Sequence, residues 1–121
     1  MELIIQFVIA LKRLVNLLLI ESLVEELKNT SNRIILYGSC ARGTDNSGSD
    51  MDLFVVTNNT DSVMETLSGF NFPTGFEDIR IQAVIKTPVE LLEMKGPEKT
   101  FMEEVEQGIV LWEKAAGESR V

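Results

Sequence analysis

Two acidic residues at alternate positions, Asp50 and Asp52, stand at the start of the apolar run 53–56 of this 121-residue chain. A strand repeats every two residues, so we expect both carboxylates to point to the same face of a sheet. Two carboxylates on one face repel each other unless a cation or a basic group compensates them. Mg²⁺ suits such a pair because it takes one or two protein carboxylates and completes its octahedron with water and substrate phosphate oxygens. The pair therefore predicts a metal site that works on a phosphate.

The turn that precedes the two aspartates predicts a seat for that phosphate. The apolar stretch 33–37 runs into Gly38-Ser39, and ten residues separate this dipeptide from Asp50. Glycine has no Cβ, so backbone N–H groups can approach an anion closely there. Arg42 follows shortly after and is a further candidate contact, with an ion pair to a nearby aspartate as the alternative. We predict that Gly38, Ser39 and Arg42 bind phosphate.

The combination of Gly38-Ser39, ten residues, and Asp50-x-Asp52 between two apolar strands resembles the polymerase-beta-like nucleotidyltransferase superfamily. The fuller form, Gly-Ser-x-Ala-Arg-Gly with Ser-Asp-x-Asp-Leu, is most similar to its minimal nucleotidyltransferase branch. The element order fits over roughly residues 33–112, and the specific motif covers residues 36–56. The resemblance implies an α/β nucleotidyltransferase fold, a nucleoside triphosphate bound by the glycine turn, and Mg²⁺, or alternatively Mn²⁺, held by Asp50 and Asp52 as catalytic residues.

The resemblance also implies a reaction and a partner. The reaction is transfer of a nucleoside monophosphate, from ATP as the first choice, to a hydroxyl of a protein or an RNA with loss of pyrophosphate. Small domains of the minimal branch often act as antitoxins, which neutralise a helical ribonuclease-type toxin by nucleotidylating a tyrosine or by direct binding. Two alternatives remain open: a degenerate module that binds a nucleotide or a protein without turnover, and a structural oligomerisation domain, which leaves the aspartate pair unexplained.

One position departs from the superfamily pattern. The resemblance implies a third carboxylate on a later strand, which helps the aspartate pair to hold two metal ions. The matching strand is 79–85, and the expected acid is replaced by Gln82, whose amide is a poor substitute for a carboxylate. Asp78 has the same strand parity as Gln82 but lies four residues earlier, which is about 13 Å along a strand at about 3.3 Å per residue. Only a bent or shifted strand would bring Asp78 near the aspartate pair. Gln82 is the reason for keeping the degenerate module as an alternative.

Composition narrows the class of protein. The length supports one domain over residues 1–121, with 45% hydrophobic and 25% charged residues. The net charge of −8 argues against an extended nucleic-acid surface. Cys40 is the one cysteine and there is no histidine, so neither an internal disulfide nor a zinc site is expected. We expect a cytoplasmic protein and an inert Cys40 thiol.

The first 29 residues predict one long amphipathic helix. Lys12, Arg13 and Asn16 interrupt the apolar run 3–20, which argues against a membrane span. The predicted apolar stripe consists of Leu3, Phe7, Leu11, Leu14, Val15, Leu18, Leu23 and Leu27. Further apolar residues flank this stripe, so it is wider than one small sheet requires. Either the helix only caps the sheet, or its outer side contacts a second copy or a partner protein.

The remaining chain, with the core at 33–112, alternates strands and helices. Strands are expected at 33–37, 51–57, 79–85 and 109–112, and helices at 61–67, from 87, and at 98–107. We predict a small mixed sheet that carries the site on one edge, with helices packed on one face. Tyr37 and Trp112 are interpreted as core aromatics.

Overall fold

The structure is a computed structural model that describes residues 2–45 and 50–115. The predicted strands and helices appear in the predicted order, with ends within two residues where both ends were predicted; the short helix Ser39–Arg42 was not among the predicted elements. They are α1 (Glu2–Leu27), β1 (Arg33–Tyr37), α2 (Ser39–Arg42), β2 (Met51–Val56), α3 (Thr60–Gly69), β3 (Ile81–Lys86), α4 (Pro88–Leu92), α5 (Pro97–Glu106) and β4 (Ile109–Glu113). Part of the loop before Asp50, including Ser49 of the motif, lies outside the described residues.

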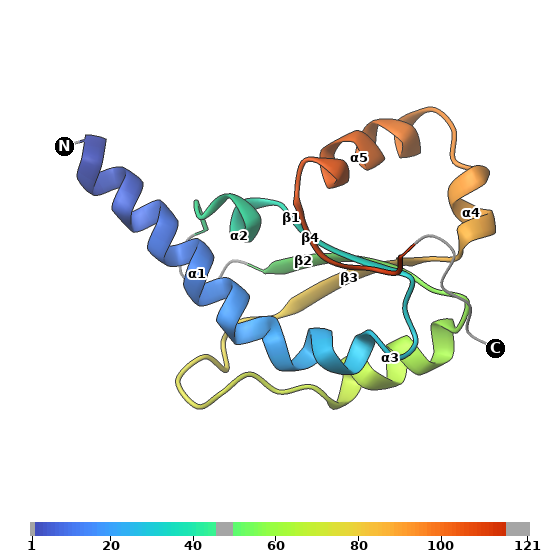
Figure 1. The fold of residues 1–121 in the computed structure, drawn as a ribbon, viewed down its shortest axis with the longest axis horizontal. Coiled ribbons are helices and arrows are strands. Elements are labelled where there is room, and N and C mark those ends of the chain that lie inside the picture. Colours follow the sequence, from blue (N-terminus) through green and yellow to red (C-terminus); the bar gives the residue numbers. More distant parts are fainter. Residues whose placement is uncertain (1, 46–49, 116–121) are drawn as a thin grey trace.

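The four strands form one mixed sheet in the order β3-β2-β1-β4 (Figure 1). β1 is antiparallel to β2 and to β4, whereas β2 and β3 are parallel. A parallel pair needs a crossover connection, and α3 lies in the connection between β2 and β3. The predicted mixed sheet, the α+β class and the long N-terminal helix are confirmed.

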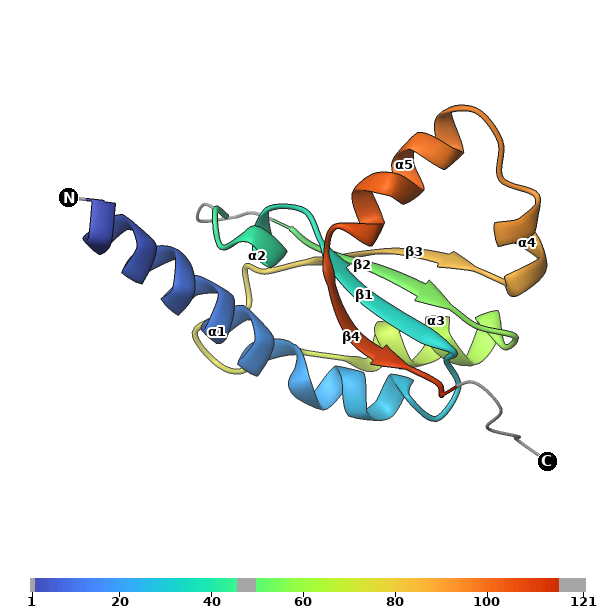
Figure 2. The ribbon, with the colours of Figure 1, turned by 45° about the horizontal axis from the view of Figure 1, so that its top comes forward.

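Helices cover both faces of the sheet, so the predicted packing on one face is wrong in this detail (Figure 2). Ile34 and Leu36 pack with residues of α1 and α3, whereas Ile35 and Tyr37 pack with residues of α4 and α5 and of the turn between them. The physical reason is visible in the composition of β1 and β2. Both are nearly continuous apolar runs, and a strand of that kind is buried on its two faces rather than on one.

Helix α1 divides into two unlike halves. Its C-terminal half is packed on the sheet through Ile20, Leu23, Val24 and Leu27. Its N-terminal end projects beyond the sheet and the other helices, while α2 lies alongside its middle (Figures 1 and 2). The predicted core stripe is therefore wrong for its first part, because five of its residues are more than half exposed: Leu3, Phe7, Leu11, Leu14 and Leu18.

By length and composition alone, α1 is also long and apolar enough to cross a membrane. Its most apolar 18-residue window has a mean hydropathy of 2.1, and 11% of that window is buried. A signal sequence or the core helix of a soluble protein would pass the same test. The absence of a membrane contact, inferred above from the interrupting polar residues, stays a prediction.

Candidate functional site

The two aspartates lie at the end of the sheet where β1 leaves it and β2 enters it. In the strand register Asp52 stands opposite Tyr37 of β1 and beside Gln82 of β3. Two residues further along β2, Phe54 packs in the cluster beneath α4 and α5. Because side chains alternate along a strand, Asp52 shares this face of the sheet. The predicted edge site thus lies on the face that α5 covers.

Gly38 fits this position for two physical reasons. Its φ of 75° lies in the left-handed region that favours glycine. A Cβ at this position would stand 2.6 Å from Oδ2 of Asp52, which is closer than non-bonded atoms allow. The absence of a side chain is therefore what lets the β1–α2 turn approach the carboxylate, as the sequence pattern predicted.

Ser39 and Arg42 are the first and last residues of α2, a single turn of helix. The N–H groups of Ala41 and Arg42 donate to the carbonyl oxygen of Gly38 at 3.1 Å and 3.2 Å. These two amides are thus engaged within the turn, which makes the amides of Ser39 and Cys40, at the start of the helix, the candidate backbone donors to an anion. Ser39 is half-buried and Arg42 is exposed.

Helix α1 holds the turn of α2 in place. Nδ2 of Asn16 donates to the carbonyl oxygen of Cys40 and to Oδ1 of Asp45, both at 3.1 Å. After α2, Gly43 adopts a φ of 74° so close to α1 that a Cβ would collide with the carbonyl oxygen of Ile9. The long N-terminal helix therefore positions the phosphate-binding turn as well as covering the sheet.

The carboxylates of the site repel one another. Burial raises the pKa of Asp52, and the charges of Asp50 and Glu104 raise it further. Nε2 of Gln82 donates to Oδ2 of Asp50 at 2.6 Å, so this amide compensates one carboxylate without adding a negative charge. Within residues 2–45 and 50–115, three or more His, Cys, Asp or Glu side chains nowhere gather closely enough to hold a metal. The donor set is thus two hard carboxylates, which fits Mg²⁺ that also binds water and phosphate.

Beside the Gly38 turn lies a cavity of about 390 Å³ that sequence reasoning did not predict in full. Arg42 lines it, as expected for a phosphate contact, together with Arg13 of α1 and Glu104 and Gln107 of α5. Neither Arg13 nor Glu104 belongs to a motif. Their place in the site depends on how α1 and α5 pack, and no local spacing in the sequence carries that information.

A second hollow, of about 480 Å³, lies at the β3 edge of the site. Its lining includes Asp50, Gln82, Asp78 and Arg80. Residue 78 precedes β3, which begins at Ile81, and the chain there is not extended strand. Asp78 thus lines the same hollow as Asp50, although it does not form a three-acid cluster with the aspartate pair.

Three further side chains, those of Cys40, Tyr37 and Trp112, pack in the interior of the protein. Burial, followed by the charges of Asp45, Asp52 and Asp50, raises the pKa of Cys40 to about 11, so its thiol stays protonated at neutral pH. Tyr37 is buried edge-to-face against Phe101 at 5.6 Å between ring centroids. Trp112 is partly buried, and its Nε1 donates to the carbonyl oxygen of Ser31 at 3.3 Å.

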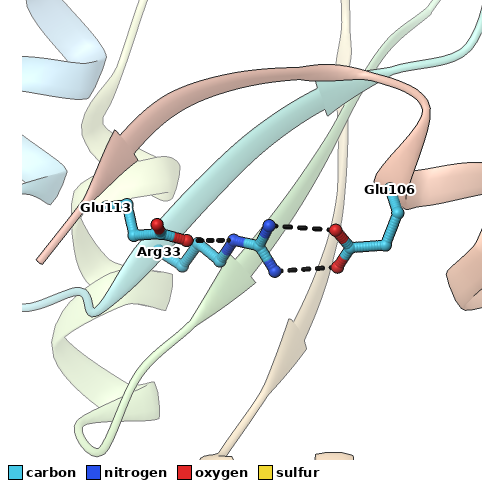
Figure 3. A network of polar contacts seen from close by, with 3 residues as sticks. All are labelled: Arg33, Glu106 and Glu113. Atoms are coloured by element: carbon cyan, nitrogen blue, oxygen red, sulfur yellow. Dashed lines mark hydrogen bonds and ion pairs between the residues drawn. The ribbon is translucent and has the colours of Figure 1, made fainter. Parts of the chain in front are cut away.

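An ion-pair network fixes α5 relative to the sheet (Figure 3). Arg33, the first residue of β1, binds Glu106 of α5 in a two-point contact at 2.7 Å and 2.9 Å. Nε of Arg33 also lies 2.8 Å from Glu113 at the end of β4. Two-point guanidinium–carboxylate contacts define orientation as well as distance. The network thus ties down the end of the helix that brings Glu104 to the site.

Comparison with known proteins assigns the chain to a family. A profile described as "Polymerase beta, Nucleotidyltransferase" matches residues 19–116, which include the glycine turn, Arg42, the two aspartates and Gln82. The chain belongs to this nucleotidyltransferase family. Among solved structures, that of a candidate nucleotidyltransferase from Sulfolobus solfataricus is similar in fold, with a TM-score of 0.55 and 18% identity over 93% of this chain and 94% of the other. A search of curated proteins gave no match.

Proposed function

We propose that this protein is a Mg²⁺-dependent nucleotidyltransferase that moves a nucleoside monophosphate from a triphosphate, ATP as the first candidate, to a hydroxyl of a protein or an RNA. Family membership supports the transferase class. The observation that carries the proposal is the close approach of the Gly38 turn to the carboxylate of Asp52, because it brings candidate phosphate donors beside candidate metal ligands.

Each site residue has a proposed role. The amides and hydroxyl at Ser39 and the guanidinium of Arg42 bind the phosphates, while Gly38 keeps that turn close to the carboxylates. Asp50 and Asp52 hold the metal, and a bound Mg²⁺ would neutralise their repulsion and polarise the phosphate oxygens. In the reaction the acceptor oxygen forms a bond to the α-phosphorus, the bond to the β-phosphate oxygen breaks, pyrophosphate leaves, and the hydroxyl proton passes to solvent.

The acceptor we propose is a tyrosine of a toxin-like protein, which makes this chain the antitoxin of a toxin–antitoxin pair. The net charge of −8 supports a protein acceptor over a long nucleic acid, since phosphate backbones are repelled by an acidic surface. Mn²⁺ would replace Mg²⁺ at the same oxygen ligands. Because nucleoside triphosphates are abundant in the cytoplasm, we propose that compartment for the protein.

A direct test is transfer of label from α-phosphate-labelled ATP to proteins and RNA of a host lysate. With Mg²⁺ or Mn²⁺ the wild-type protein is expected to label an acceptor, and Asp50→Asn and Asp52→Asn should reduce the rate at least ~1,000-fold. Asp61→Asn, an exposed acid in the first turn of α3, is the matched control and should transfer at the wild-type rate. Equal labelling by wild type and Asp52→Asn would reject the proposed site.

The hydrogen bond from Gln82 to Asp50 favours a second candidate, a nucleotide-binding module without turnover. This candidate predicts ATP binding by the wild type with no transfer. Gln82→Asp, which supplies a third carboxylate beside Asp52 in the register, would then create or raise transfer. A wild-type rate that Gln82→Asp leaves unchanged would instead support an enzyme that works with two acids.

A further inference from the structure

The N-terminal half of α1 carries a regular row of outward-facing apolar side chains, Ile4, Phe7, Leu11, Leu14 and Leu18, which we call the seam. Their spacing alternates between three and four residues. This is the heptad spacing of a and d positions, whose side chains interlock when two helices pack along their length. Each seam side chain is between 53% and 69% exposed. The seam therefore has the pattern of a helix–helix interface with one helix absent.

The opposite side of α1 packs against the body of the protein and carries the polar residues that interrupt its apolar run. Nζ of Lys12 donates to the carbonyl oxygen of Asp45 at 2.5 Å, and Asn16 is 5% exposed, with its hydrogen bonds to Cys40 and Asp45 described above. Further along, Ile20 and Leu23 of this side are fully buried. In its N-terminal half the helix departs from the usual arrangement of a surface helix, because Lys12 and Asn16 face inward while the seam faces water. Covering the sheet does not account for the seam.

Charge restricts what could cover the seam. The spacing continues beyond Leu18 to Glu21 and Glu25, both exposed, so the apolar row ends there. Within the row, its neighbours Leu3, Val8 and Val15 are apolar as well. Two copies of this helix packed side by side would thus meet without like charges along the row itself.

The acidic end of the seam also favours one orientation. In a parallel pair, Glu21 and Glu25 of both copies would stand together at the continuing seam positions and repel each other. In an antiparallel pair, Phe7 of one copy meets Leu18 of the other and Leu11 meets Leu14, while the acidic ends lie at opposite ends of the interface. The other elements that contact α1, chiefly α2 and α3, lie on the side of α1 away from the seam, so the seam is left open to a second helix.

We propose that two copies of this chain associate through an antiparallel coiled-coil contact between their α1 seams. A membrane surface is disfavoured because Lys12 is engaged with the body and the net charge is −8, so anionic headgroups would repel the protein. The proposal is independent of the nucleotidyltransferase function, as the seam lies on the side of α1 that faces away from α2 and the sheet.

The first test is the mass of the full chain in solution, measured by sedimentation over a range of concentrations. The wild type is expected to be a dimer, and Leu11→Glu should raise the dimer dissociation constant at least ~100-fold, since it buries an unpaired charge at the centre of the seam. Leu92→Glu is the matched control, because Leu92 is 86% exposed on α4, and it should remain dimeric. Far-ultraviolet circular dichroism should show Leu11→Glu to be folded.

A second test separates the two orientations in a Cys40→Ser background. Mixed Phe7→Cys and Leu18→Cys proteins are expected to form a disulfide-linked heterodimer, whereas either variant alone should stay unlinked. Self-linking of Leu18→Cys would overturn the antiparallel orientation. A wild-type protein that does not self-associate would overturn the proposal. In that case, flotation with phosphatidylcholine–phosphatidylglycerol vesicles would assign the seam to a membrane, and a complex with a different protein would assign it to that partner.

Discussion

The carboxylate site and the α1 seam are both energetically unfavourable in the isolated chain, and the physical cause differs between them. At the site, burial raises the pKa of Asp52, and the charges of Asp50 and of Glu104 on α5 raise it further. At the seam, a single helix presents apolar side chains to water. The first cost is electrostatic and is relieved by a cation, whereas the second is hydrophobic and is relieved by an apolar surface. The comparison separates the two proposed binding places by their chemistry, because one calls for a cation and the other for an apolar surface.

Truncations on the two sides of α1 would test whether the seam is unnecessary for the fold of one copy. Leu23→Ala removes a fully buried side chain from the body side and should lower the free energy of unfolding by about 2–5 kcal/mol. Leu14→Ala, on the exposed seam, should cost less than about 1 kcal/mol in dilute protein. Urea denaturation at low protein concentration measures both. An equal loss for the two variants would show that the seam is part of the monomer's core.

The close approach at the site can be tested by adding a single methyl group. Gly38→Ala places a Cβ against Oδ2 of Asp52 and also strains a left-handed residue, so it should lower stability by about 1–3 kcal/mol and abolish Mg²⁺-dependent ATP binding. Gly75→Ala is the control for strain, because its φ is 99° while no atom lies within 4 Å of the new Cβ. Thermal unfolding and isothermal titration with ATP separate the two effects.

The outcome for Gly75→Ala decides how the Gly38 result is interpreted. It should lose stability through backbone strain yet bind ATP as the wild type does, since it lies outside the two cavities of the site. If Gly38→Ala bound ATP normally, the glycine turn would have only a conformational role, and the proposed phosphate seat would be wrong.

Most of the fold could be predicted because its signals are local. The apolar run 33–37 identifies β1 directly in the sequence. A proline marks the start of α4, and a glycine follows the end of α5. Thr87 and Glu90 form a complete capping box at the predicted helix start. What failed was the packing of helices on the sheet, because the apolar runs of β1 and β2 were not read as strands buried on both faces.

The site was predictable where it rests on strand parity and on glycine, and not where it rests on tertiary packing. Gly38 and Asp52 meet as their spacing predicted. Glu104 lies on a helix more than fifty residues after Asp52, and no pattern in the sequence predicted that it would lie at the site. The predicted stripe of α1 failed for a related reason. Periodicity identifies an apolar side of a helix, but it does not say which side faces the body.

The raised pKa of Asp52 leads to the smallest of the expected effects, a change of stability with pH in the absence of metal. A carboxyl group whose folded-state pKa lies above its ordinary value of 3.8 favours the folded state below that value, and this contribution is lost as the pH rises through the folded-state pKa. At pH 7 in EDTA the ionised Asp52 therefore destabilises the protein. Asp52→Asn should raise Tm there by about 1–3 °C, a modest shift because the group is partly solvated.

Two further conditions make this prediction specific to the ionised carboxylate of Asp52. Below pH 3.5 or so, wild-type Asp52 is protonated, and the difference in Tm from Asp52→Asn should disappear. Added Mg²⁺ should stabilise the wild type and not the variant, since only the wild type keeps both carboxylates to hold the ion. The prediction fails if Asp52→Asn has a lower Tm than the wild type at pH 7 in EDTA. That result would show that the carboxylates are already compensated in the isolated chain. The contrast between the carboxylate site and the apolar seam would then not hold.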